Sequence, residues 1–271
     1  MKYRFLVLGS DLRQHYLYEL LQSKEYEARI IADIEQCNIT ATVEDFDVIL
    51  LPVSGSGSIY RRIKDFLQPG QIVCGVHILG NEPKLTGVTY IEYMDSDATA
   101  YENAVATAEG TIALAITMSP VNLAGNRCLV AGYGRCAEVL CEKLKGLGGL
   151  VTVVERSANR RACARAHGID TLDFVQLVQN VERIPTYSYI FNTVPAMVFL
   201  EKILCHTKDD VVILDIASGN GGVDFKFCEK NGICTKHALG IPGIYAPKTS
   251  AEILYAVLMD RLTNSNRRLE G

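Results

Sequence analysis

The sequence has little that would mark a membrane, secreted or nucleic-acid-binding protein. No apolar run reaches the length that spans a membrane, and no signal-peptide pattern precedes the first apolar segment. Lys and Arg are not strongly clustered, and the 27 basic and 31 acidic residues give a net charge of −4, which argues against nucleic acid as the main partner. We therefore expect a soluble, cytoplasmic protein with neither a membrane nor a nucleic-acid partner.

The nine cysteines form no CxxC pair and are an odd number. In an intracellular chain, scattered cysteines are most simply small buried hydrophobic residues. Cys228, Cys234 and His237 come nearest to a metal-ligating group, but their spacing fits no standard zinc pattern and a further ligand is needed. We predict no metal site. The hydrophobic content of 48% and the charged content of 21% favour a sizeable core over disorder.

Residues 127–157 have the strand–turn–helix–strand pattern of nucleotide-binding α/β proteins. Cys128–Ala131 and Val151–Val154 are short apolar runs, typical of buried parallel strands. Glu138–Lys145 lies between them and has helical composition. This pattern is the context in which a glycine-rich turn indicates a dinucleotide site.

The turn after the first of these strands fits G-x-G-x-x-[G/A]. Gly132 allows the tight turn, Gly134 leaves room for a pyrophosphate, and the small Ala137 lets the helix pack close to the strand. Arg135 belongs to the same turn, and the helix N-terminus offers N–H groups to the phosphates. We predict that these four residues bind a dinucleotide; the alternative is a Rossmann-like half with an empty site.

The residues expected at the ribose give two conflicting signals. Glu155 ends the second strand about 20 residues on, where NAD enzymes place an acid for the ribose hydroxyls. Arg156, Ser157 and Arg160 would instead suit a 2′-phosphate. Glu155 would repel that phosphate unless its long side chain swings outward. We favour NADP as the cofactor, with NAD as the alternative.

Strands alternate with helices along the whole chain, which predicts parallel sheets covered by helices on both faces. We expect two Rossmann-like α/β domains: residues 1–121 bind the substrate and residues 122–245 bind the dinucleotide. The long helix 97–118 connects them, and a C-terminal helix, 246–262, packs back on the first domain. The remaining predicted elements are strands 5–8, 28–32, 46–51, 71–76, 187–192, 211–216 and 235–239, a strand that begins at residue 169, helices 12–23, 60–67, 160–167, 173–180 and 225–230, a turn at 240–243 and a frayed tail, 263–271.

Loops at the carboxyl ends of parallel strands are where open α/β sheets bind ligands. In the first domain, Arg13 is a candidate partner for a substrate carboxylate. The alternative is that Asp11 caps the helix and Arg13 is a solvated helix residue. Ser54 and Gly55 are further candidates, because the flexible loop 54–58 is rich in backbone donors and hydroxyls.

The second domain and the connecting helix supply the remaining candidates. Asn192 and Thr193 follow a predicted strand and are expected on the nicotinamide side. Ser218, in the glycine-rich loop after the next strand, is grouped with them. Asp224, in the same loop, either takes part in the chemistry or caps the next helix. Glu109 either faces the cleft between the domains or points to solvent.

Several motifs make the chain resemble the A subunits of dipicolinate synthase, a sporulation enzyme of endospore-forming bacteria. Ser10, Ala106 and Glu155 depart from the pattern of that family, and the last of these leaves the choice of NADP open. The motifs span nearly the whole chain in order: Gly9–Gln14, Asn103–Gly110, Gly132–Arg135, Asn192–Ala196, Asp215–Phe225 and Pro242–Thr249.

The resemblance implies an oxidoreductase that converts dihydrodipicolinate to pyridine-2,6-dicarboxylate with NADP as hydride acceptor. It also implies that the partner is a flavoprotein-like B subunit and that the protein works in the mother cell during sporulation. A dicarboxylate needs cations and N–H donors, which Arg13, loop 54–58, Lys248 and Thr249 would supply.

Aromatisation of the ring also needs a base within hydrogen-bond reach of the ring proton. Glu109 and Asp224 are the candidates, whereas His237 lies outside the shared motifs. Two other functions stay open: a non-catalytic nucleotide-binding subunit that recruits the flavoprotein, and a 2-hydroxyacid-type dehydrogenase. The second normally has an Arg and a Glu–His arrangement, which we do not find. A homo-oligomer is also open.

Overall fold

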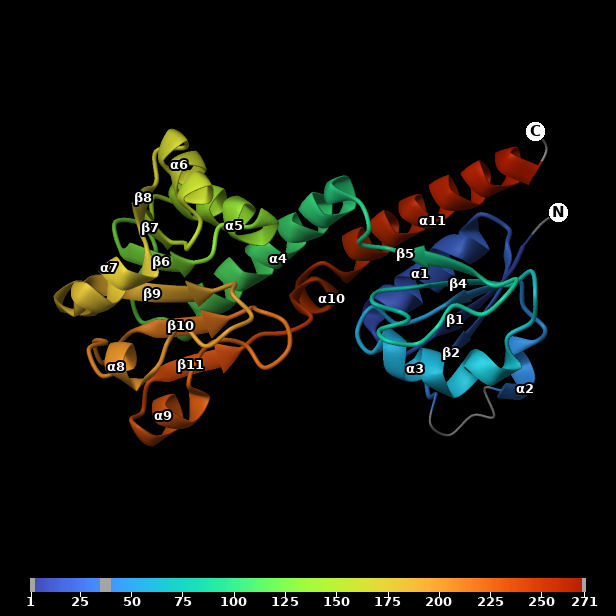
Figure 1. Cartoon of the computed structure of the whole chain (residues 1–271), viewed down its shortest axis with the longest axis horizontal. Coiled ribbons are helices and arrows are strands. Elements are labelled where there is room, and N and C mark those ends of the chain that lie inside the picture. The colour runs from blue at the N-terminus through green and yellow to red at the C-terminus, as the bar shows by residue number, and fades with distance from the viewer. Residues whose placement is uncertain (1–2, 35–39, 270–271) are drawn as a thin grey trace. The chain divides into compact units, whose positions relative to one another are not determined.

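The computed structural model describes residues 3–34 and 40–269 and divides into two compact units (Figure 1). The first unit combines residues 1–103 with 242–271, and the second is 104–241. The division falls inside helix α4 (Asp97–Met118), whereas the sequence analysis places the end of the first domain at residue 121. The reason is packing: the later part of α4 contributes four buried residues to the core of the second unit, namely Ala108, Ile112, Leu114 and Ala115.

The first unit contains a five-stranded parallel sheet of order β2-β1-β3-β4-β5. Three of the strands are buried along most of their length, as expected for apolar runs covered on both faces. The order reverses between β1 and β3, so the loops after these two strands meet at a switch point. The strands are β1 (Arg4–Leu8), β2 (Glu27–Ile31), β3 (Val48–Leu50), β4 (Ile72–Gly75) and β5 (Thr89–Glu92).

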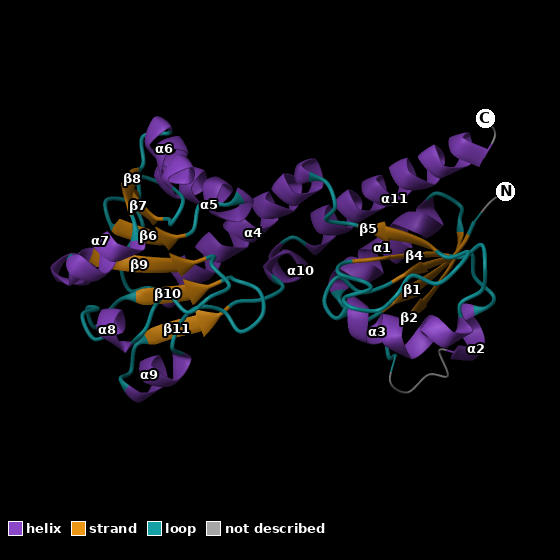
Figure 2. Cartoon of the chain, in the orientation of Figure 1, coloured by secondary structure: helices purple, strands orange, loops and turns teal. Residues whose placement is uncertain are grey.

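Helices cover both faces of this sheet (Figure 2). On one face, α1 (Leu12–Ser23) packs beside α11 (Pro247–Leu269), whose Leu254, Leu258 and Leu262 share a core with β1. The C-terminal helix therefore packs on the first sheet. The other face carries α2 (Thr40–Val43), α3 (Ser56–Ile63) and the 3-10 turn Lys64–Phe66.

The second unit contains a six-stranded parallel sheet of order β11-β10-β9-β6-β7-β8. Counted from its own first strand, this is the 3-2-1-4-5-6 order of dinucleotide-binding sheets, and its switch point lies between β6 and β9. The predicted pair of Rossmann-like parallel-sheet domains is confirmed. The strands are β6 (Arg127–Ala131), β7 (Leu150–Val154), β8 (Asp170–Leu172), β9 (Tyr187–Asn192), β10 (Val212–Asp215) and β11 (Cys234–His237).

Two apolar cores, one on each face, hold the helices of the second unit to its sheet (Figure 1). α4, α5 and α6 cover one face. Leu177, Ile203 and Cys228 come from the helices on the other face. The helices are α5 (Arg135–Gly146), α6 (Ala158–Ala166), α7 (Phe174–Gln179), α8 (Glu201–Leu204) and α9 (Phe225–Lys230), with a 3-10 segment, η2, at Val181–Thr186.

Three local predictions are wrong, and some short elements, such as β5, were not predicted. Residues 241–245 form the short helix α10 rather than a turn, because Pro242 fits a first helical turn. α3 begins at Ser56, inside the loop predicted as flexible. The tail predicted as frayed continues α11 to Leu269. Strand β5 was not predicted, since four residues with one buried side chain leave a weak pattern.

No described helix combines the length and apolarity needed to cross a membrane. Among the same residues, no group of three or more His, Cys, Asp or Glu side chains is placed to hold a metal ion.

Candidate functional site

The turn between β6 and α5 is fixed by the glycine at its start. Gly132 has a φ of +91°, a conformation that side-chain-bearing residues rarely adopt. A Cβ at this position would lie 2.4 Å from Oγ1 of Thr193. Thr193 in turn donates from Oγ1 to the carbonyl of Ala131 at 2.8 Å. The loops after β6 and β9 therefore interlock at the switch point, where Thr193 packs against the turn.

The second glycine of the turn leaves open space instead. Gly134 is the N-cap of α5, and the only atom within 4 Å of a Cβ built there is Nη1 of Arg160, at 3.8 Å. Ala137, in the first turn of α5, is fully buried, and its small side chain lets α5 lie close to the sheet. A helix N-terminus with an open approach and a guanidinium beside it has the geometry of an anion site.

Glu155 braces the turn from the end of β7. The residue is 5% exposed. Its Oε2 accepts a hydrogen bond from the Tyr133 N–H at 2.9 Å, and its Oε1 accepts one from the Ser157 N–H at 2.8 Å. The carboxylate is thus turned inward, towards two backbone donors, and does not swing outward as the argument for NADP required.

The polar residues that follow Glu155 are either bonded to the protein or free. Ser157 caps α6, and Arg161 donates from Nη1 to the carbonyls of Glu155 and Arg156 at 2.6 and 2.8 Å. Arg156 and Arg160 are exposed. Neither of these two side chains has a hydrogen-bond or ion-pair partner within the described part of the chain, so both guanidinium groups are available to an anionic ligand.

Behind this turn, Tyr133 links the site to the helix layer. Its ring is buried and its hydroxyl lies 3.0 Å from Nδ1 of His167. Burial raises the pKa of Tyr133 to about 12, so the phenol stays protonated at neutral pH. The sequence analysis gave this residue no role, because the pattern treats its position as variable.

A buried network around Asp215 organises the loops that follow β9 and β10. Asp215 is fully buried, and it accepts hydrogen bonds from Asn192 Nδ2 (2.9 Å), the Ala217 N–H (2.9 Å) and the Gly222 N–H (2.6 Å). Asn192, predicted to contact the cofactor, is itself fully buried and serves this network. Ser218 is exposed in the same loop.

Asp224 follows that loop and caps α9. Its Oδ1 accepts a hydrogen bond from the Phe227 N–H at 3.0 Å, which is the capping role that the sequence left open. Its Oδ2 has no hydrogen-bond partner among the residues that the structure covers. His237 stacks on Phe225 and its Nε2 lies 2.9 Å from the carbonyl of Ala217, so it helps to hold the loop.

Glu109 lies on the surface of α4 with a partner of its own. Lys143 donates to its Oε1 at 2.8 Å, and the Glu109 side chain is 60% exposed. Thr107, two residues earlier on α4, hydrogen-bonds the side chain of Cys136 in the first turn of α5, so this part of α4 also approaches the N-terminal end of α5.

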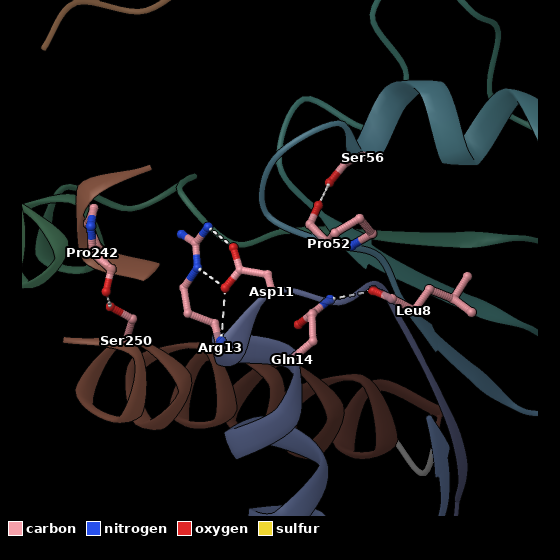
Figure 3. Close-up of polar contacts among 8 residues, drawn as sticks. All are labelled: Leu8, Asp11, Arg13, Gln14, Pro52, Ser56, Pro242 and Ser250. Atoms are coloured by element: carbon pink, nitrogen blue, oxygen red, sulfur yellow. Dashed lines mark hydrogen bonds and ion pairs between the residues drawn. The ribbon is translucent and has the colours of Figure 1, made fainter. Parts of the chain in front are cut away.

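In the first unit, the loop after β1 holds a buried ion pair (Figure 3). Arg13 is 3% exposed and pairs with Asp11 through two donors: Nε bonds Oδ1 at 2.9 Å, and Nη2 bonds Oδ2. Asp11 also caps α1 by accepting from the Arg13 N–H. The predicted capping of the helix by Asp11 is thus confirmed, whereas the prediction that Arg13 is solvated is wrong. A substrate carboxylate would meet Nη1, the one terminal nitrogen without a partner in the described structure.

Beside this pair, Gln14 is fixed by a bond from its Nε2 to the carbonyl of Leu8 at 2.9 Å, while its buried Oε1 has no partner among the described residues. In the loop after β3, Ser54 and Gly55 are exposed. Ser56 is buried and donates to the carbonyl of Pro52 at 2.5 Å, which explains why the helix starts there.

Lys248 and Thr249 are exposed in the first turn of α11. That turn offers N–H groups and the positive end of the helix dipole. Both residues therefore keep the position from which they would contact an anionic substrate.

Comparison with known proteins agrees with these observations. No family model matches the chain. The chain is 35% identical over 282 residues to the A subunit of dipicolinate synthase of Bacillus subtilis, with 94% of each sequence covered. The solved structure of the dipicolinate synthase A subunit from Bacillus halodurans has a TM-score of 0.81 at 25% identity and covers 97% of this chain and 98% of that chain.

A second solved structure, that of the dipicolinate synthase A subunit from Bacillus subtilis, has a TM-score of 0.79 at 25% identity and covers 99% and 98% of the two chains. D-lactate dehydrogenase from Escherichia coli has a TM-score of 0.71 at 15% identity, with 97% of each chain covered. At this identity the comparison shows a shared fold only. Because the chain is 35% identical to the Bacillus subtilis protein over 94% of its length, it belongs to the family of dipicolinate synthase A subunits.

Proposed function

We propose that this protein is an oxidoreductase subunit that converts dihydrodipicolinate to dipicolinate with NADP as hydride acceptor. The reaction removes a hydride, which a bound nicotinamide cofactor accepts, and a ring proton, which a base accepts. The observation that carries the proposal is the 35% identity to the dipicolinate synthase A subunit over 94% of the chain. We also propose that the protein acts in sporulation and that its partner is a flavoprotein-like B subunit.

The geometry at Gly134 supports the cofactor. A pyrophosphate needs backbone N–H donors, space and positive potential, and the open N-terminus of α5 with Arg160 beside it offers all three. Arg160 and Arg156 are the cations nearest to the expected 2′-phosphate. Glu155 is held inward by backbone donors, which is the arrangement that favours NAD, so the proposal of NADP rests on the two arginines.

For the dicarboxylate, we propose the edge of the first sheet where β1 and β3 diverge. Nη1 of Arg13, the N–H groups near Gly55 and the first turn of α11 at Lys248 and Thr249 are donors suited to carboxylates. Within the Asp11–Arg13 pair, Asp11 is a positioning residue: it holds the guanidinium plane so that Nη1 remains available.

For the base, Asp224 is the stronger of the two candidates. It lies on the loop at the carboxyl end of β10, in the nicotinamide half of the sheet, and one carboxylate oxygen lacks a partner among the described residues. Glu109 already pairs with Lys143. Asn caps helices as well as Asp, so Asp224→Asn keeps the cap and removes the base. We expect Asp224→Asn to lower kcat about 100-fold or more and to leave nucleotide affinity unchanged. Glu109→Gln should lower kcat much less.

The test is reduction of NADP with a coupled supply of dihydrodipicolinate, with and without the B subunit. Reduction by this chain alone supports the proposal. Reduction only with the partner supports a shared site. Tight nucleotide binding without reduction in either case would overturn the catalytic assignment in favour of a recruiting subunit. Reduction of NAD by a 2-hydroxyacid instead would identify the other type of dehydrogenase.

A further inference from the structure

A polar cavity of about 590 Å³ lies along the open edge of the second sheet. Its place follows from the strand order, because β8 is an edge strand that pairs only with β7. The cavity extends from α6 past β8 to α7 and η2, and its lining includes none of the residues of the Gly132–Ala137 turn. It is lined by Thr152, Arg161, Arg165, Asp170, Thr171, Leu172, Asp173, Gln176 and Arg183.

The cations of this cavity are not neutralised by its own acids. Arg161 bonds two backbone carbonyls, and Arg165 donates to Oγ1 of Thr171 at 2.9 Å. The Arg183 side chain has no partner within the described residues. No ion pair joins any of these arginines to Asp170 or Asp173 in the described structure. Three guanidinium groups around one cavity, with donors to spare, suit an oxyanion that accepts several hydrogen bonds.

The other lining groups indicate what the rest of the ligand carries. Asp173 uses Oδ1 to cap α7 through the Gln176 N–H at 2.8 Å, and Asp170 has no partner in the described part of the chain. Two carboxylates, two threonine hydroxyls and an amide accept or donate hydrogen bonds to hydroxyl groups. Leu172 is the only apolar residue of the nine, so the lining is unsuited to a base or another flat apolar ring.

The edge strand adds backbone groups to the same wall. The Leu172 carbonyl accepts from the Glu155 N–H at 3.1 Å, so Leu172 faces β7. Because successive residues of a strand point their N–H and C=O groups to opposite sides, Thr171 presents its own to the cavity. Charged side chains also protect an edge strand from pairing with another chain. That role requires the charges, but it does not require a cavity of ligand size.

We propose that this edge cavity is a binding site for a small phosphorylated polyol. The arginines hold the phosphate, and Asp170, Asp173 and Thr171 hold the hydroxyls. The site is separate from the turn at Gly134 and does not depend on the function proposed above.

Titration calorimetry of the full chain with ribose 5-phosphate, ribose and inorganic phosphate tests the proposal. Arg183→Gln removes a cation that holds no other side chain, and Arg127→Gln is the matched control, since Arg127 is an exposed arginine at the start of β6. We expect ribose 5-phosphate to bind more tightly than either fragment. Arg183→Gln should weaken the affinity for ribose 5-phosphate about tenfold, and Arg127→Gln should leave this affinity unchanged.

Three results would overturn the proposal. Absence of binding at millimolar ribose 5-phosphate would show that the cavity is not a sugar-phosphate site. Binding that Arg183→Gln and Arg165→Gln both leave intact would locate the ligand elsewhere. Inorganic phosphate as tight as the sugar phosphate would leave a plain anion site. Thermal melting of each variant checks that it folds, and NADP affinity should not change in Arg183→Gln.

Discussion

The guanidinium of Arg13 lies directly against the backbone of Gly243: a Cβ on that glycine would be 2.8 Å from Nε and 3.0 Å from Cζ. The two residues are far apart in the chain, yet α10 closes over the start of α1. Because Asp11 also holds the guanidinium through Nε and Nη2, moving Arg13 away from Gly243 would strain or break that ion pair. Gly243 is therefore required by the buried ion pair rather than by its own backbone.

The first prediction follows from this contact. Gly243→Ala should destabilise the protein by about 1–3 kcal/mol, the usual cost of overpacking a filled site. Gly146→Ala is the control, because Gly146 is helical and has nothing within 4 Å of its Cβ position; it should be neutral or slightly stabilising. Urea unfolding measures both. Equal stability of the two variants would mean that Arg13 moves aside freely.

The second prediction concerns acid stability. Burial raises the pKa of Asp11, but the hydrogen bonds and charge of Arg13 outweigh it and bring the pKa below its ordinary value of 3.8. A lowered folded pKa contributes stability that is present above the unfolded pKa and lost as pH falls through the folded one. Asp11→Asn should cost about 3 kcal/mol at neutral pH, and this deficit should shrink below about pH 4.

Urea unfolding at several pH values between neutral and acid tests this. Asp47→Asn is the control: Asp47 pairs with Arg4 at an exposed position, where such pairs contribute about 0–1 kcal/mol. Asn still caps the helix, so a deficit in Asp11→Asn that stays constant into strong acid would show that the ion pair does not account for it.

Local rules predicted the glycine-rich turn between strand and helix because each of its requirements is met within a few residues. The tight turn at Gly132, the open Gly134 and the buried Ala137 follow from strand, turn and helix alone. The Asp11–Arg13–Gly243 arrangement did not follow, because its members come from the two ends of the chain. The glycine pair after Asp215 was a usable signal: a Cβ on Gly221 would lie 2.4 Å from Asp215 Oδ2, so the loop must wrap a buried carboxylate.

The third prediction separates folding from binding at the turn. Gly132→Ala should destabilise the protein, because its φ is positive and Thr193 Oγ1 fills the space. Gly134→Ala should leave the melting temperature unchanged, since only Arg160 lies within 4 Å of the new Cβ, yet weaken nucleotide binding about tenfold by crowding the pyrophosphate. Calorimetric titration with NADP, beside thermal melting, measures both. Undiminished affinity in a folded Gly134→Ala would place the pyrophosphate elsewhere.

The fourth prediction addresses the 2′ end of the cofactor. If Arg160 contacts the 2′-phosphate, Arg160→Gln removes a charge-assisted hydrogen bond worth about 1.5–3 kcal/mol, so NADP affinity should fall roughly ten- to a hundredfold. NAD lacks that phosphate, and its affinity should change little. Arg127→Gln, at the amino end of the central strand β6, controls for the loss of one positive charge. Equal losses for NADP and NAD would instead assign Arg160 to the pyrophosphate, which its position 3.8 Å from the Cβ site of Gly134 would also explain.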